Sequence, residues 1–268
     1  MIEYNPEGSL LRTDQLELLK MLQVFSDICE KNGIRWWLCS GTLLGAARNG
    51  GFIPWDDDID VSMLKEDYRK LEKILAAMDS DEYFFQSIDT DPEYVNIFGR
   101  FRKKEGGRNV TADPRTAFYK YKGIGFDIFC IEKSSRFAAH MAKTLYFGTQ
   151  KFTLHMKNTA ARQSAIRFVK ALNRLVLIPF CRLVGLVNPK GQYHYELGSG
   201  FYKSPFYFDD IFPLSRITFE GVDFPAPGNT DAYLTKIYGD WRKLPSEASI
   251  RKSIHCQDYI DEIFGTEE

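Results

Sequence analysis

Residues 38–61 read LCSGTLLGAARNGGFIPWDDDIDV, and the acidic run near the end of this stretch is its most informative feature. Asp58 and Asp60 stand two residues apart in a segment, 58–63, that we predict to be a β-strand. Alternate residues of a strand point to the same face, so the two carboxylates project together while their neighbours face the core. Adjacent carboxylates repel each other, and a hard divalent cation such as Mg²⁺ relieves that repulsion. The spacing therefore predicts a metal site.

Two further features point to phosphate chemistry at the same place. Asp127 is a lone acid in an apolar predicted strand, 125–131, where it needs a partner. The small-residue turn Ser40-Gly41 precedes a short predicted helix, 42–48, and a phosphate can approach backbone N–H groups at such a helix start. The alternative is a solvated acidic turn and a capped strand end. Because the features occur together, we favour the metal and phosphate site.

Hydrophobic periodicity predicts an α/β (α+β) fold in which helices flank a mixed sheet. Asp14 is the expected N-cap of the first helix, and Glu220-Gly221 the expected turn of a hairpin over 217–224. The remaining expected helices are 14–31, 66–78 and 230–238, and the remaining strands are 34–39, 83–87 and 95–102. We expect one catalytic domain over 1–268, with a basic, mainly helical insertion at 133–195.

The bulk composition excludes several classes of protein. The 268 residues are 44% hydrophobic and 26% charged, as in an ordinary globular protein. The five cysteines are scattered, which fits reduced thiols and gives no Cys-x-x-Cys site. The N-terminus has no signal-peptide pattern, and no apolar run is long enough to span a membrane. We therefore expect a cytoplasmic protein, with a peripheral position on the inner face of the membrane as a further expectation.

The segment 133–195 has no Asp or Glu and eleven Lys or Arg, so its formal charge is +11 against −12 for the remainder of the chain. On a helical wheel four cations fall within one arc beside a broad apolar face, and Pro179 is expected to kink the helix. This pattern favours contact of 162–187 with an anionic membrane surface over nucleic acid binding. The alternative is a core-packed helix with a solvated cationic face. The four cations are Arg167, Lys170, Arg174 and Arg182.

Residues 38–48 and 51–61 closely resemble the LicD family, which includes bacterial phosphocholine transferases and the domains of fukutin and fukutin-related protein. Phe126-Asp127-Ile128-Phe129 resembles a later strand motif of the family, and 219–240 resembles its C-terminal signature. The resemblance runs from about residue 15 to 256 and is weakest over 133–195. Cys130 and Glu132 depart from the usual Pro and Asp of the family, and neither position is a motif acid.

The resemblance implies a polymerase-β-like nucleotidyltransferase fold and an enzyme that depends on Mg²⁺ or Mn²⁺. The implied reaction moves a phospho-alcohol group, such as phosphocholine, from a CDP-linked donor to a hydroxyl of a cell-surface glycan precursor, which a lipid can carry, and it releases CMP. A true nucleotidyltransferase is the alternative, and a non-enzymatic membrane-bound scaffold is a third reading. No nucleic acid partner is expected.

The resemblance also implies which residues of this chain are catalytic, hold the metal and bind the donor. Three acids are expected to be catalytic and to hold the metal: Asp58, Asp60 and Asp127. Four residues are expected at the donor phosphate: Ser40, Gly41, Thr42 and Arg48, although Arg48 could equally be a solvated cation at a helix end. Further candidate substrate contacts are Arg100, Arg102, Asp240 and His255, with turn or structural roles as the alternative for the last two. Asp56 and Asp57 are expected to be supporting or turn residues.

Overall fold

The structure is a computed structural model that describes residues 3–106, 118–154, 156, 159–188, 190–201, 203 and 205–265. Its main sheet has six strands in the order β1-β2-β5-β4-β3, with β6 beside β5. Only the β2–β5 pair is parallel among these pairings. The strands are β1 (Trp37–Leu38), β2 (Asp60–Leu64), β3 (Tyr83–Gln86), β4 (Gly99–Lys103), β5 (Gly125–Lys133) and β6 (Tyr193–Tyr195). The predicted mixed sheet flanked by helices is confirmed.

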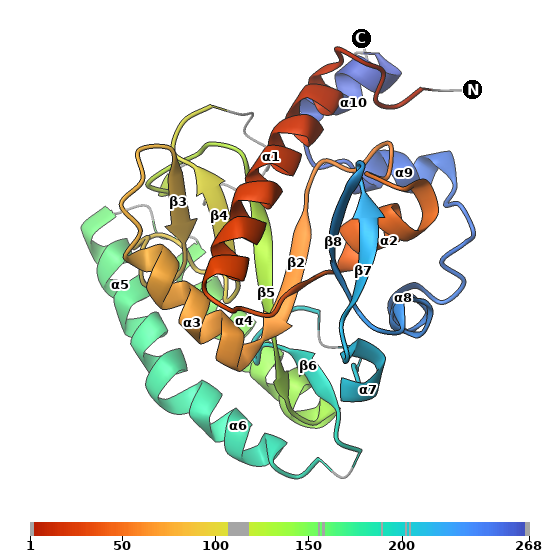
Figure 1. Cartoon of the computed structure of the whole chain (residues 1–268). Coiled ribbons are helices and arrows are strands. Elements are labelled where there is room, and N and C mark those ends of the chain that lie inside the picture. Colours follow the sequence, from red (N-terminus) through yellow and green to blue (C-terminus); the bar gives the residue numbers. More distant parts are fainter. Residues whose placement is uncertain are drawn as a thin grey trace.

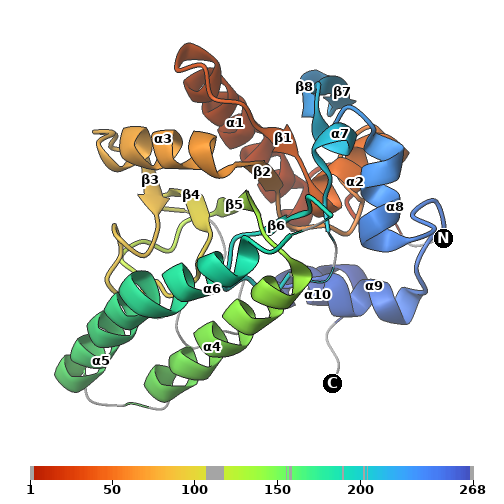
Figure 2. The same cartoon turned by 90° about the horizontal axis from the view of Figure 1, so that it is seen from below.

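Helices cover the two faces of this sheet (Figures 1 and 2). The first face carries α1 (Leu10–Lys31) and α3 (Lys65–Ala76), and on it Phe25 packs against Phe101 and Phe126 with ring centroids 6.0 and 5.4 Å away. The other side carries α4 (Arg136–Leu154), α5 (Thr159–Leu172), the π-helical turn η2 (Asn173–Leu177) and α6 (Ile178–Gly185). Because Phe101 and Phe126 face α1, Arg100, Arg102 and Asp127 project from the opposite face.

A smaller unit lies beside β1 and holds the loop that carries the acidic run. It consists of α2 (Ser40–Asn49), α7 (Phe208–Ile211), α8 (Thr230–Tyr238) and the hairpin β7 (Ser215–Phe219) with β8 (Val222–Ala226). Glu220 at the hairpin turn pairs with Arg12 of α1 at 2.6 Å and accepts a hydrogen bond from the Phe52 backbone at 3.0 Å. The chain ends with α9 (Glu247–Ser253) and α10 (Gln257–Phe264).

Several expected boundaries differ from those observed. The first helix begins at Leu10, not at Asp14, because the Ser9 side chain accepts from the Arg12 N–H and caps it. The strand expected from Asp58 begins at Asp60, because its partner β1 ends at Leu38 before the chain turns into α2. The helix after the Ser40-Gly41 turn in fact includes both residues.

The basic segment 133–195 is mainly helical, as expected, but it also contains the short strand β6, which was not among the expected strands. The interruption expected at Pro179 appears as η2 directly before the proline-containing turn of α6, where a wider turn accommodates the altered hydrogen bonding. Residues 155, 157, 158 and 189 of this segment lie outside the described residues. Among the helices described, none is both long and apolar enough to cross a membrane.

Candidate active site

A cleft of about 770 Å³ opens on the sheet face opposite α1, and it gathers most of the predicted site residues. Strands β2, β4 and β5, the start of α2 and the segment before α10 all contribute to it. Its lining includes eight of the residues predicted from the sequence: Ser40, Gly41, Asp58, Asp60, Arg100, Arg102, Asp127 and His255.

Strand register places three charged groups in a row across the floor of the cleft. Asp60 of β2 is the register partner of Asp127 of the parallel strand β5. Arg100 of β4 is the register partner of Asp127 on the other side, and its guanidinium Nε donates to Asp127 Oδ1. Neighbouring strands lie about 4.8 Å apart, so side chains in register are adjacent. The sheet itself therefore brings the two acids together.

Electrostatic repulsion is concentrated at this row. Burial and the neighbouring Asp58 and Asp127 carboxylates raise the pKa of Asp60 well above its usual range. Burial and Asp57 likewise raise the pKa of Asp58. Among the described residues, neither Asp58 nor Asp60 forms an ion pair. Two carboxylates without an ion-pair partner in the described part of the chain, next to the Asp127 carboxylate, fit a hard divalent cation, as Mg²⁺ and Mn²⁺ are.

The start of α2 is shaped so that its backbone is accessible beside the acids. Ser40 has φ of +48°, a left-handed conformation that costs a non-glycine residue about 1 kcal/mol or more. A Cβ on Gly41 would lie 2.6 Å from Asp56 Oδ2, so only glycine lets Asp56 approach. The Thr42 hydroxyl is buried and accepts the Asp60 N–H at 2.8 Å. Thr42 thus holds β2 against α2 from behind the cleft.

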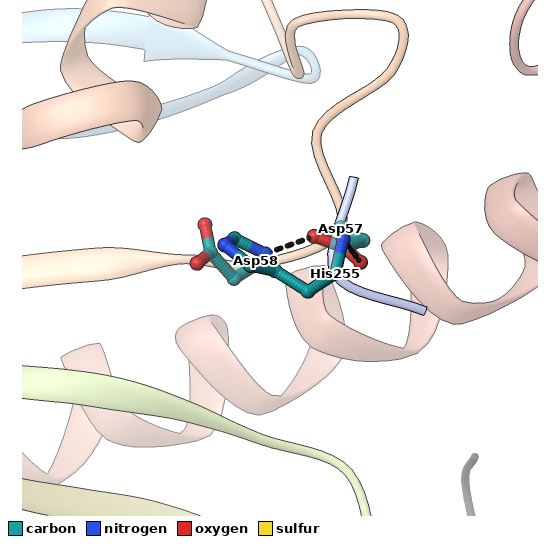
Figure 3. A group of neighbouring side chains, drawn as sticks. All are labelled: Asp57, Asp58 and His255. Carbon is teal, nitrogen blue, oxygen red and sulfur yellow. Dashed lines mark hydrogen bonds and ion pairs between the residues drawn. The ribbon is translucent and has the colours of Figure 1, made fainter. Parts of the chain in front are cut away.

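A histidine from the C-terminal segment completes the wall next to Asp58 (Figure 3). His255 Nδ1 lies 2.8 Å from Asp57 Oδ1, while the backbone N–H groups of His255 and Cys256 donate to Asp57 Oδ2 at 3.0 and 3.2 Å. The hydrogen bond to Asp57 is the main cause that raises the pKa of His255 to about 9. Candidate ligand atoms of Asp57, Asp58 and His255 lie within 4.8 Å of one another, but this group could hold a metal ion only with the imidazole in its neutral form.

Neither Arg48 nor Asp240 is among the residues that line the cleft. The Arg48 guanidinium lies 5.9 Å from the Trp55 ring centroid and donates to the Trp241 carbonyl at 3.5 Å. Asp240 is exposed, and its carbonyl accepts the Lys243 N–H. Asp240 thus lies in a turn, which is the alternative that the sequence left open for it, whereas Arg48 is half-buried against Trp55 and is not the solvated cation of its alternative.

Arg102 differs from Arg100 although both alternate on β4. Its Nε donates to Gln86 Oε1 at 3.1 Å and its Nη1 to the Gly123 carbonyl at 2.7 Å, so both hydrogen bonds of its guanidinium go to the protein at the edge of the cleft.

Sequence reasoning missed an aromatic wall of the cleft made by Phe129, Tyr195 and Phe201, whose ring centroids lie 5.2 to 6.0 Å apart. The alternating aromatic pattern of 193–195 was the available signal.

Comparison with known proteins identifies the family. The family model described as LicD/FKTN/FKRP, nucleotidyltransferase domain, matches residues 33–187, which is more than half of the chain and includes β2, β4 and β5. The chain belongs to the LicD family. It is accordingly a transferase of LicD type.

Relatives of this LicD-family chain support the assignment. The lipopolysaccharide cholinephosphotransferase LicD of Haemophilus influenzae is 26% identical over 269 residues, which cover 92% of this chain and 97% of that protein. The human ribitol 5-phosphate transferase FKRP is 46% identical over 50 residues, 19% of this chain and 10% of that protein. The human ribitol-5-phosphate transferase FKTN is 38% identical over 61 residues, 23% of this chain and 13% of that protein.

Proposed function

We propose that this enzyme transfers a phospho-alcohol group from a CDP-linked donor to a hydroxyl of a cell-surface glycan precursor and releases CMP. The observation that carries the proposal is the placement of Asp58, Asp60 and Asp127 in one cleft, two of them as register partners. The names of the relatives add the class of group transferred, because one is a cholinephosphotransferase and another a ribitol 5-phosphate transferase. The cholinephosphotransferase is named for lipopolysaccharide, which also supports a glycan acceptor.

In this proposal Asp58, Asp60 and Asp127 hold Mg²⁺ or Mn²⁺. When bound, the metal supplies neutralising charge to the phosphate oxygens. The protein then has to position the two substrates, which is most of what phosphoryl transfer requires. The acceptor oxygen forms a bond to the distal phosphorus of the donor, and the bond from that phosphorus to the CMP oxygen breaks. We assign Asp127 to accept the proton of the acceptor hydroxyl, since Arg100 keeps one of its oxygens in place.

The donor phosphates are proposed to lie between the start of α2 and two cations of the cleft. Ser40 and Gly41 present backbone at the helix start. His255 stays protonated over the neutral range because its pKa is raised to about 9, and it lies beside Asp58 (Figure 3). Arg100 is the second cation. The positive charges offset the acids, which would otherwise repel an anionic donor.

Product analysis separates this proposal from the alternative. The enzyme is incubated with Mg²⁺, a glycan acceptor and CDP-choline, CDP-glycerol or CDP-ribitol, and CMP is measured by ion-exchange chromatography. Release of CMP together with the modified acceptor supports the proposal. Pyrophosphate release from a nucleoside triphosphate, without turnover of any CDP-alcohol, would instead indicate a true nucleotidyltransferase. A protein that is inactive in both assays would instead favour the non-enzymatic scaffold.

A further inference from the structure

The helical segments α5, η2 and α6 follow one another along one side of the molecule and form a rod (Figures 1 and 2). Seven of the fifteen large hydrophobic side chains exposed among the described residues lie within 168–187. Leu175, Leu183 and Leu186 are 73%, 66% and 76% exposed. The full set, called the apolar ridge below, is Phe168, Leu175, Val176, Phe180, Leu183, Leu186 and Val187. Large apolar side chains that gather on one element, unlike singly scattered ones, point to an interaction site.

The cations of the rod are arranged differently from our expectation. Lys170 Nζ donates to the carbonyls of Ile88, Asp91 and Pro92 at 2.9 to 3.1 Å. Arg174 pairs with Asp89 at 2.8 Å, and Arg182 pairs with the buried Glu132 at 2.9 Å. Three of the four cations that were expected on a membrane-facing arc therefore fasten the rod to the protein. The side that is left for a partner is the apolar one.

Exposed cations flank the apolar ridge at both ends. Arg167 lies at the α5 end, and Lys190 follows the α6 end. Lys133 and Arg136, also exposed, lie near the α6 end too, because Ser134 and Ala138 are the nearest neighbours of Gly185. No acid occurs anywhere in 133–195. A second copy docked on this surface would therefore bring the flanking cations of the two copies close together, which is unfavourable.

We propose that the apolar ridge inserts into the interface of an anionic lipid membrane, with the flanking cations on lipid headgroups. The combination of exposed large apolar side chains and flanking cations, on a segment that contributes no acid of its own, is the chemistry of interfacial helices. Arg182 then links the membrane-bound rod to the active site, because it pairs with Glu132 of β5, the strand that also carries Asp127. The proposal does not depend on which donor the cleft binds.

Vesicle co-sedimentation of the full chain, without donor or acceptor, tests this proposal. The probes are vesicles that contain phosphatidylglycerol and vesicles of phosphatidylcholine alone. The expected result is sedimentation with the anionic vesicles that weakens at high salt, because headgroup contacts are screened. The Phe180→Ser/Leu183→Ser variant should bind at least roughly tenfold less, since it removes two large apolar side chains from the insertion. Leu244→Ser, which changes a residue 63% exposed in the loop between α8 and α9, should bind like wild type.

Three results would overturn the proposal. The first is a wild-type chain that stays in the supernatant with anionic vesicles at low salt, and the second is a double variant that sediments as well as wild type. The third is a wild-type dimer in analytical ultracentrifugation that the double variant does not form, together with no vesicle binding, which would assign the apolar ridge to self-association. An unchanged thermal midpoint of the variants shows that they fold, and unchanged turnover of a soluble acceptor separates this test from the proposed chemistry.

Discussion

Asp60 of β2 and Asp127 of β5 are register partners on the parallel pair of strands, and Arg100 of β4 pairs with Asp127 from the other side. The order acid, acid, arginine across the sheet has a clear electrostatic consequence. One carboxylate of the pair has a cationic neighbour in the protein, whereas among the described residues Asp60 forms no ion pair. The predictions below concern what this arrangement binds and how its surroundings support it.

Replacing either register partner should abolish turnover and metal binding while the fold survives. Asp60→Asn or Asp127→Asn is expected to lower kcat by roughly 10³-fold or more, because the charge-stabilising ligand is lost. The rise in thermal midpoint on addition of Mn²⁺ should also disappear. Without metal, Asp60→Asn should be at least as stable as wild type, since it relieves repulsion. Asp81→Asn, at an exposed acid outside the cleft, is the matched control. Wild-type rates in either variant would contradict the metal assignment.

A methyl group at Gly41 should disturb the site from the side of α2. The Cβ of Gly41→Ala would meet Asp56 Oδ2 at 2.6 Å, so Asp56 or the helix start must shift. We expect a loss in kcat/KM of about tenfold or more, since small displacements near reacting groups are costly. Gly148→Ala in α4 serves as the control, because no atom lies within 4 Å of the added carbon there. It should keep full activity and gain up to about 1 kcal/mol of helix stability. Equal effects of the two changes would argue against a role for the turn.

Pairing with Asp57 should make part of the stability depend on pH through His255. The folded-state pKa is raised from the ordinary 6.5 to about 9, so the folded protein binds the proton more tightly than the unfolded chain does. The resulting stabilisation is fully present below pH 6.5 and is lost as the pH rises through 9. Because the ring is 53% exposed, solvent screening reduces the effect to about 1 kcal/mol. Urea unfolding of wild type and His255→Gln should differ at pH 6 and converge at pH 10. A difference in the free energy of unfolding between wild type and variant that grows with pH would contradict the predicted direction.

The two arginines of β4 should fail in different ways. Arg100→Gln is expected to lower kcat by roughly a hundredfold and to lose stability mainly in the absence of metal, because it removes the charge that orients Asp127 and offsets the neighbouring acids. Arg102→Gln should instead destabilise the fold by about 2 kcal/mol, because it breaks buried hydrogen bonds to Gln86 and Gly123. Thermal unfolding and steady-state kinetics on both variants make the comparison. A normal rate in Arg100→Gln would remove Arg100 from the site.

Much of the sheet and the acids of the cleft could be predicted, because both follow from local patterns. Alternation along β2 and β5 and the two-residue spacing of Asp58 and Asp60 are visible in the sequence. The register that places Asp60 beside Asp127 is a long-range relationship, and no local pattern specifies it. The C-terminal placement of His255 against Asp57 is similar, since 198 residues separate the two.

The predictions that changed were those in which tertiary contacts decide between equivalent local readings. Ser9 and Asp14 are both good caps, and the helix begins at the earlier one. The cations of α5 and α6 looked free on a helical wheel, but acceptors from loop 88–92 and from β5 bind Lys170, Arg174 and Arg182. A wheel shows which residues share a face of one helix, and it does not show what lies opposite that face.

The most direct test of the central claim follows the fate of the distal phosphorus. CDP-choline carrying ³²P at the phosphate next to choline is incubated with the enzyme, Mg²⁺ and a glycan acceptor, and the products are separated. We predict that the label appears on the acceptor while the released CMP is unlabelled, and that both products vanish in Asp60→Asn. Label that stays with free phosphocholine, with CMP transferred to the acceptor, would contradict the proposed transfer and would assign the cleft to nucleotidyl transfer.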